Sequence, residues 1–249
     1  VIVAAGATNS AALMLRSAND QHPNGLANGS DMVGRNYMSH NNGTFLAISM
    51  EPNDSIFQKT LAMSDFYHAS DIWEYPMGLI QMLGKVDTEL MMFESPEPLG
   101  GMTYEEMAQH SLDFWLQTED LPDPNNRVTL NSRGQIVFNY TQNNLKAYDR
   151  LVAQLQSLLS PIGCHEELIP VDYYLGTKLP FNLAHQCGTL KFGADPQVSV
   201  LDLNCKAHEL DNLYVVDGSF FPSAGAVNPS LTIIANAIRV ADHLRERLT

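Results

Sequence analysis

The residue with the clearest chemical potential is a histidine in the last quarter of the chain. His185 lies in a short segment without helical or strand periodicity, so we expect it on a loop or at a strand end. A lone histidine is most often structural or solvated. An imidazole can nevertheless accept a hydroxyl proton near neutral pH, which alcohol oxidation requires as a hydride leaves the same carbon. His185 is therefore a candidate catalytic base.

A turn and a helix start follow this histidine. Asp217-Gly218 ends an apolar strand-like run, and Asn228-Pro229 precedes a helical pattern. We expect Asn228 at the N-cap and Pro229 at the first helical position, because asparagine satisfies an orphan amide and proline has none to satisfy. Alternatively, Asn228 projects into a cavity where the positive end of the helix faces a developing anion, such as a reduced flavin.

Cysteine and histidine spacing allows a rival interpretation. His185-x-Cys187 and Cys205-x-x-His208 offer the nitrogen and sulfur ligands that zinc prefers. The first pair is too close in sequence for the usual zinc-finger pattern, so we assign no metal ligands. Together with Cys164 the chain has three cysteines, which cannot all pair, and this favours a reducing compartment. Localisation is otherwise left open.

Composition limits the classes of partner. The 249 residues are 45% hydrophobic, enough to bury a sizeable core, and the formal charge is -14. So acidic a chain would be repelled by nucleic acid and by anionic membrane surfaces, and small neutral substrates fit more easily. We see no apolar run long enough to span a membrane and no signal peptide.

The elements expected around these residues begin with a buried strand over 1–5 that runs into Gly6, followed by a short helix over 9–16. Because the chain opens inside a strand without a Met, we expect the natural N-terminus to lie upstream. A long polar loop over 19–44 is of the kind that serves function. The chain closes with a strand over 213–216 and a helix whose apolar residues share one face: Leu231, Ile234, Ile238, Ala241 and Leu248.

The middle of the chain favours an antiparallel sheet. A hairpin loop is expected at 131–134, and a helix from Leu145 to Leu159 should stop at Pro161 and Gly163. The expected strands are short apolar runs separated by turn residues: 45–50, 61–66, 77–83, 90–93, 112–116, 128–130 and 136–140.

Together these motifs resemble the glucose-methanol-choline (GMC) family of flavin-dependent oxidoreductases, specifically the carboxy-terminal half of a member. The first ten residues are similar to a strand and turn that return to the family's FAD domain, and Val33-Gly34-Arg35-Asn36 with His40 is similar to a "VGRN…H" loop. The block from His185-Gln-Cys-Gly-Thr to Val227-Asn-Pro-Ser is similar to the family's carboxy-terminal motif. The stretch 45–180 matches in general character alone.

The resemblance implies an α/β plus α+β fold. A partial FAD-binding, Rossmann-like domain would carry an inserted antiparallel-sheet substrate domain. Residues 1–44 would be the returning part of the FAD-binding domain with a flavin-proximal loop, 45–180 the substrate-binding domain, and 181–249 the part that carries the active site.

The implied reaction is oxidation of a primary or secondary alcohol, of the alcohol or sugar class. His185 would take the hydroxyl proton, Asn228 would hydrogen-bond the same oxygen, and hydride would pass to flavin N5. Oxygen or another carrier would accept the electrons. Residues implied to contact FAD are Gly6, Asp217, Gly218, Asn228 and Pro229.

One departure from the family pattern limits these expectations. The Gly-x-Gly-x-x-Gly strand-turn-helix that carries the pyrophosphate is absent from the 249 residues, so we expect them alone to bind FAD poorly and to be inactive. Two alternative functions stay open. One is a flavin-containing lyase on the same scaffold, and the other is a non-enzymatic zinc-binding module.

Overall fold

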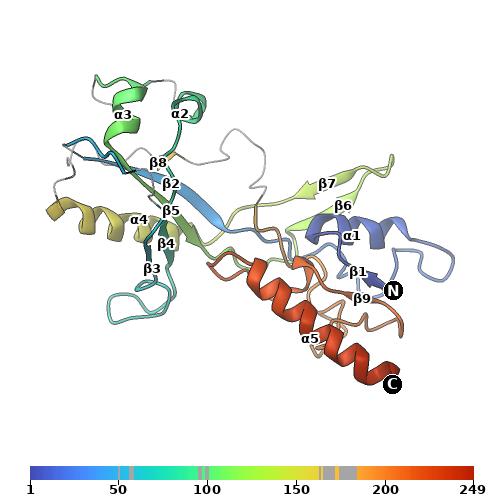
Figure 1. The fold of residues 1–249 in the computed structure, drawn as a ribbon. Helices are drawn as coiled ribbons and strands as arrows, with labels where there is room; N and C mark the ends of the chain where they lie inside the picture. Colours follow the sequence, from blue (N-terminus) through green and yellow to red (C-terminus); the bar gives the residue numbers. More distant parts are fainter. Residues whose placement is uncertain are drawn as a thin grey trace. The chain divides into compact units, whose positions relative to one another are not determined.

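The structure is a computed structural model that divides the chain into two compact units (Figure 1). Unit 1 combines residues 1–40, 120–143 and 184–249, and unit 2 combines 41–119 with 144–183. The division expected from the sequence differs from these units chiefly in the segment 120–143, which belongs to unit 1, and its boundaries at 44 and 180 lie within four residues of those of the units. The residues that the structure describes are 1–49, 51–55, 59–94, 97–98, 101–162, 164, 172–173 and 184–249.

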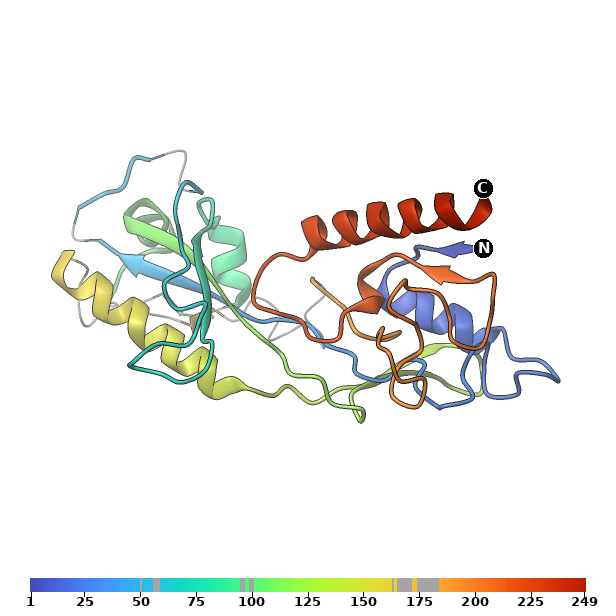
Figure 2. The same cartoon turned by 90° about the horizontal axis from the view of Figure 1, so that it is seen from below.

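Unit 1 is built around two short parallel strands that are far apart in the sequence. Strand β1 pairs with β9 in the register Ile2 to Tyr214 and Val3 to Val215. Both views place this pair between α1 and α5 (Figures 1 and 2). The elements of unit 1 are β1 (Ile2–Val3), α1 (Ala7–Arg16), β6 (Arg127–Leu130), β7 (Ile136–Asn139), β9 (Tyr214–Val215), the 3-10 helix η3 (Gly218–Phe220) and α5 (Ser230–Leu248).

The glycine turn and first helix are confirmed. Gly6 has a φ of +85°, which glycine adopts at little cost, and α1 begins at the next residue. Its Ala11 and Met14 lie in the core of unit 1. The expected buried strand over 1–5 is shorter and more exposed than predicted, because of its five residues only Val3 is buried.

The closing helix is also confirmed, with a different start. The N-cap of α5 is Pro229, whose carbonyl accepts the first helical bond from the Ile233 amide at 3.0 Å, so the expected N-cap Asn228 lies one residue before it. Helix ends commonly shift by a residue in this way. The apolar side chains expected on one face are exposed, with Leu231 at 79% and Leu248 at 80%.

The expected hairpin is confirmed as the pair β6–β7, which forms its own two-stranded sheet in unit 1. Leu130 pairs with Ile136 across the loop. The side-chain oxygen of Asn131 accepts the amides of Arg133 and Gln135 at 2.9 and 3.0 Å. This local network explains why the turn could be read from sequence.

Unit 2 contains a mixed helix and sheet arrangement with the expected antiparallel sheet. The strand order is β3-β4-β5-β2-β8, and every neighbouring pair is antiparallel. The elements are β2 (Asn41–Ile48), β3 (Ala62–Met63), β4 (Gly78–Met82), α2 (Thr88–Glu94), α3 (Tyr104–His110), β5 (Ser111–Thr118), α4 (Leu145–Leu159), the 3-10 helix η1 (Ser160–Ile162) and β8 (Asp172–Tyr173).

Helices cover both faces of this sheet. Phe45 and Ala47 of β2 belong to the core that includes α4, whereas Leu46 and Ile48 belong to the core that includes α2 and α3. Successive strand residues point to opposite faces, so a strand covered on both sides is buried throughout. All eight residues of β2 are buried accordingly, including the start of the strand at 41–44, which was expected to be loop.

Two elements of unit 2 correct the sequence-based prediction. The run 90–93, expected as a strand, is part of α2. The Leu and Met residues of the run, and the Glu residues on either side of it in α2, are strong helix formers, and a short apolar run does not distinguish the two structures. Helix α3 was not predicted, although Thr103 and Glu106 form a capping box that is readable in the sequence.

Helix α4 was predicted correctly over Leu145–Leu159. Pro161 follows it within η1, and Gly163, the other expected stop, lies outside the described residues. Within the described part of the chain, no helix combines the length and apolar character needed to cross a membrane.

A buried carboxyl lies on the sheet face toward α2 and α3. Asp113 of β5 pairs with Leu46 of that core, and its carboxylate accepts the Val86 amide at 3.4 Å. The nearby Lys85 ammonium donates to the carbonyls of Ala108 and Ser111 at 2.6 and 3.0 Å. Burial raises the pKa of Asp113 to about 6, despite the opposing effect of Lys85.

We expect Leu151→Ala to lower the free energy of unfolding by about 3 kcal/mol, because it leaves a cavity between α4 and the sheet. Leu151 is 0% exposed. The matched control is Leu158→Ala on the same helix, where the side chain is 45% exposed and the expected change is below about 1 kcal/mol. Urea unfolding of both variants checks this, and equal losses would contradict the assignment of the core.

We expect Asp113→Asn to stabilise the protein at pH 7 by about 1–3 kcal/mol and to have little effect near pH 4. The folded-state pKa of about 6 lies above the ordinary value of 3.8, so the folded protein holds a proton that the unfolded chain releases. The stability that this bound proton contributes to the folded state is lost as pH rises from 3.8 to about 6. Urea unfolding at pH 4 to 7 measures it, and parallel curves for variant and parent would refute it.

Candidate active site

Two segments far apart in the sequence bring a second histidine beside His185. Met38 and Cys187 form an antiparallel bridge, with the Met38 amide 3.0 Å from the Cys187 carbonyl and the Cys187 amide 2.9 Å from the Met38 carbonyl. In the same antiparallel register, His40, two residues after Met38, lies opposite His185, two residues before Cys187. Their Nδ1 atoms are 2.9 Å apart. The sequence analysis assigned His40 no chemical role, because the pairing of two segments so far apart in the chain cannot be read from the residues around His40.

His185 occupies a bend, as expected, with a φ of +63°. Burial lowers its pKa. Burial also lowers the pKa of His40 to about 4, an effect that the neighbouring His185 increases and the Ala224 carbonyl opposes. Both imidazoles are therefore neutral at pH 7, and a neutral imidazole is the form that can accept a proton.

Asp217 ties two turns together. Its carboxylate accepts the Gly6 amide at 3.0 Å and the Ser219 amide at 2.9 Å, together with the hydroxyls of Ser10 and Ser219. The first turn joins β1 to α1, and the second follows β9. These four donors fix the ends of the two parallel strands relative to each other.

The segment that carries His185 is bonded to both of these turns. Thr8 donates to the Gln186 side-chain oxygen at 2.6 Å, and the Thr189 hydroxyl donates to the Ala7 carbonyl at 2.6 Å. The Gly188 amide donates to the Gly218 carbonyl at 3.2 Å. Of the residues singled out from sequence, the structure thus brings together Gly6, Asp217 and Gly218, and it bonds the segment that carries His185 to the same two turns.

The two remaining candidates lie at the start of α5. Asn228 is exposed and Pro229 is buried. The helix they precede approaches the 217–219 turn, since a β-carbon added at Gly218 would lie 3.5 Å from Cδ1 of Ile233. The first turn of α5 carries no acidic residue. Its positive end is therefore not neutralised by its own side chains.

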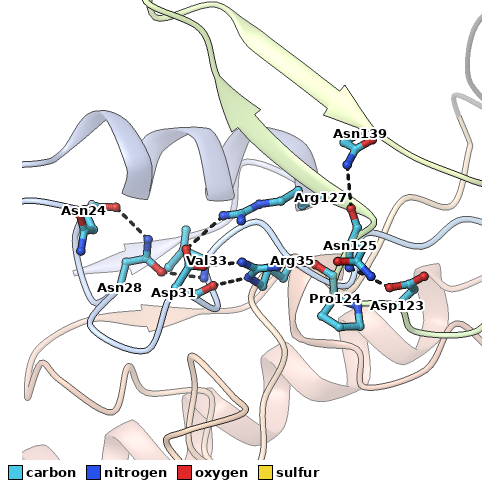
Figure 3. Close-up of polar contacts among 10 residues, drawn as sticks. All are labelled: Asn24, Asn28, Asp31, Val33, Arg35, Asp123, Pro124, Asn125, Arg127 and Asn139. Atoms are coloured by element: carbon cyan, nitrogen blue, oxygen red, sulfur yellow. Dashed lines mark hydrogen bonds and ion pairs between the residues drawn. The ribbon is translucent and has the colours of Figure 1, made fainter.

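The loop that leads to His40 is anchored by charged and amide side chains (Figure 3). The Asp31 carboxylate lies between the guanidinium groups of Arg35 and Arg127, and the hydrogen bond from Arg35 lowers the pKa of Asp31. Arg35 also donates to the Pro124 carbonyl at 2.8 Å, and the Val33 amide donates to Asn28 at 2.9 Å. These contacts hold the Val33–Asn36 motif in place.

The structure does not support the zinc interpretation. Cys205 contacts Asn236, whose side-chain nitrogen lies 3.4 Å from its Sγ, and His208 lies 3.1 Å from both the Ser199 hydroxyl and the Gly193 carbonyl. Among the residues described, no group of three His, Cys, Asp or Glu side chains is placed to hold a metal ion. The four proposed ligands are thus not gathered as one site.

Comparison with known proteins gives a consistent family. A family model described as GMC oxidoreductase matches residues 122–237. The chain is 28% identical to 6'''-hydroxyparomomycin C oxidase of Streptomyces lividus over 98% of its length, and 30% identical to paromamine 6'-oxidase of Streptomyces fradiae over 96%. It spans 45% and 44% of those two relatives. The structure of pyridoxine 4-oxidase from Mesorbium loti has a similar fold, with a TM-score of 0.61 and 21% identity over 98% of this chain and 51% of that one.

We expect Gly188→Ala to lower the free energy of unfolding far more than Gly6→Ala. The two glycines have nearly equal φ values of +87° and +85°, so both substitutions carry a similar backbone cost of about 1–2 kcal/mol. An added β-carbon at Gly188 would lie 2.2 Å from the Asn36 carbonyl oxygen, whereas at Gly6 it would meet no atom within 4 Å. Urea unfolding of the two variants measures the difference, and similar losses would contradict the close approach at Gly188.

Proposed function

Because the chain belongs to the GMC oxidoreductase family, we propose that it supplies the catalytic residues for oxidation of an alcohol or sugar hydroxyl. The family consists of FAD-binding enzymes that act on CH–OH groups. The observation that carries the proposal is the neutral His185, half-buried and bonded through its segment to the turns at 6–8 and 217–219.

Unit 1 is proposed as part of a Rossmann-like FAD-binding domain. Its first strand, glycine turn and helix form a βα unit, and the strand pairs in parallel with β9. Parallel strands followed by helices are the usual framework of dinucleotide sites, with the ligand at the carboxyl ends of the strands. Gly6 and Asp217 both lie just after those ends.

The residues present fit such a cofactor. The space beside Gly6 is open in the direction of a β-carbon, so backbone can be approached closely there. The N-cap residue of α5, Pro229, has no side-chain acceptor, and the first turn of this helix has no acidic residue, whereas at the start of α1 the Asp217 carboxylate already accepts the Gly6 amide. The amides and positive end of α5 suit an anionic group such as the reduced ring of a flavin.

Asp217 would contribute indirectly to cofactor binding. Its carboxylate already accepts four hydrogen bonds from protein donors. Direct contacts in the ribityl and pyrophosphate region would then come from the main chain of Gly6 and Gly218. Pro229 and the Asn228 backbone would face the pyrimidine edge of the flavin.

The proposed chemistry assigns proton transfer to the protein. His185 accepts the proton of the substrate hydroxyl, and the Asn228 side-chain amide donates a hydrogen bond to the same oxygen as negative charge develops on it. Bound FAD supplies the oxidant that accepts the hydride from the carbinol carbon. A base that is neutral at pH 7 suits this role, because a protonated imidazole cannot accept the proton.

Substrate choice is proposed to lie with residues 45–180, most of which belong to unit 2. The same scaffold could instead serve a lyase in which the flavin undergoes no redox change. Oxygen and other electron carriers are both compatible as acceptors with the residues assigned here.

The reaction class is tested by the absorbance of the protein expressed from its complete reading frame. We expect a bound flavin that bleaches on anaerobic addition of one member of a panel of alcohols and sugars. Bleaching establishes hydride transfer and identifies the substrate class. A flavin that stays oxidised while a substrate is cleaved would favour the lyase, and a protein without flavin would overturn the proposal.

The base is tested by His185→Ala in the same protein. We expect kcat to fall by about 10²–10⁴-fold with flavin content retained, because removal of a general base has effects of this size. The matched control is His22→Ala in the surface loop after α1, which should change kcat less than about twofold. Unchanged turnover of His185→Ala would remove His185 from the mechanism.

A further inference from the structure

The protonation of the two facing histidines can be deduced from their other contacts. Nε2 of His40 lies 3.3 Å from the carbonyl oxygen of Ala224. A carbonyl oxygen can accept a hydrogen bond but cannot donate one, so Nε2 of His40 carries the hydrogen. Because a neutral imidazole has a single N–H, the Nδ1 atom of His40 is then an acceptor.

The acceptor role of His40 Nδ1 determines which nitrogen of His185 carries the hydrogen. The two Nδ1 atoms lie 2.9 Å apart, a hydrogen-bond distance that requires a hydrogen on one of them. Since Nδ1 of His40 is the acceptor, Nδ1 of His185 is the donor. A neutral His185 therefore has its lone pair on Nε2.

We propose that His40 is a positioning residue that holds His185 in the Nδ1–H tautomer and so makes Nε2 the atom that receives the hydroxyl proton. The inference rests on the proposed function of His185. In the reaction the substrate O–H bond breaks and an Nε2–H bond forms, and bound FAD would supply the acceptor for the hydride and its electron pair from the carbinol carbon. The imidazolium produced keeps its Nδ1–H bond to His40 throughout.

The surroundings hold His40 in the required orientation. His40 is 2% exposed, and its ring meets the ring of His185 edge to face, with centroids 4.8 Å apart. The Met38–Cys187 bridge fixes the register two residues before His40, and the Ala224 carbonyl lies 3.3 Å from Nε2 of the ring. The main-chain bridge and this carbonyl thus control which way the His40 ring faces.

A neutral acceptor has a different effect from a carboxylate in this position. A carboxylate would orient the base and also stabilise its protonated form by charge. His40 orients the ring without adding a negative charge to a buried site, so the base stays weak and neutral. This arrangement suits a base that must release its proton again after each turnover.

The test uses two substitutions of His40 in the protein expressed from its complete reading frame. His40→Leu removes the acceptor, and His40→Asn supplies an amide oxygen near the position of Nδ1. We expect His40→Leu to lower kcat by about 10- to 100-fold with KM and flavin content little changed, because orientation of a general base is lost. His40→Asn should restore kcat to within about fivefold of the parent.

Ser39→Ala is the matched structural control. It removes the hydrogen bond from the Ser39 hydroxyl to the Ala184 carbonyl, at 2.9 Å, and alters neither imidazole. We expect its kcat to stay within about threefold of the parent. Equal losses of kcat in His40→Leu and His40→Asn would show that His40 acts through general packing. A loss of kcat in Ser39→Ala as large as that of His40→Leu would show the same, and either result would overturn the proposal.

A spectroscopic measurement separates this inference from the proposed function. In protein labelled with ¹⁵N-histidine, the ring nitrogen shifts of His185 should show a protonated Nδ1 and an unprotonated Nε2, and His40→Leu should shift this balance toward Nε2–H. The opposite tautomer in the parent would refute the role of His40 whatever the activity. The expected tautomer together with full turnover of His185→Ala would instead refute the proposed base.

Discussion

The arrangement of unit 1 depends on one buried carboxylate. Asp217 accepts four hydrogen bonds, from the amides of Gly6 and Ser219 and from the hydroxyls of Ser10 and Ser219. A buried carboxylate without such donors would carry a large desolvation cost, so this set of contacts must form together. It joins two segments separated by more than 200 residues. The β1–β9 pair has only two paired positions, and the contacts of Asp217 additionally fix its end.

The histidine pair is a consequence of that fixed end. Once the 217–219 turn is set, the Gly188 amide bonds to it and Thr189 bonds to the start of α1. The close approach of Gly188 to Asn36 then lets the Met38–Cys187 bridge form, and the pleat of that bridge sets His40 against His185. The geometry of the histidine pair therefore depends on main-chain contacts together with the side-chain hydrogen bonds of Asp217 and Thr189.

Local signals and long-range contacts account for what could be predicted from the sequence. Helices α1, α4 and α5 and the hairpin at 131–134 follow from apolar period and turn residues within a few positions, and the structure contains them. The run 90–93 was mistaken for a strand because four apolar residues fit either period. Neither the bridge between Met38 and Cys187 nor the membership of 120–143 in unit 1 has a local cause, since both depend on where distant segments pack.

The two units differ in how completely they cover their apolar surface. In unit 2 both faces of the sheet are covered by helices, whereas α5 of unit 1 exposes a stripe that includes Leu231, Ile234 and Ile238. Parallel strands are normally buried on both faces, and exposed apolar stripes of this kind are typical of interfaces. The relatives have more than half of their length outside the matched part. The contacts that hold the segment of His185 come from the turns at 6–8 and 217–219 and from Met38, so these hydrogen bonds, which fix its geometry, do not involve this stripe.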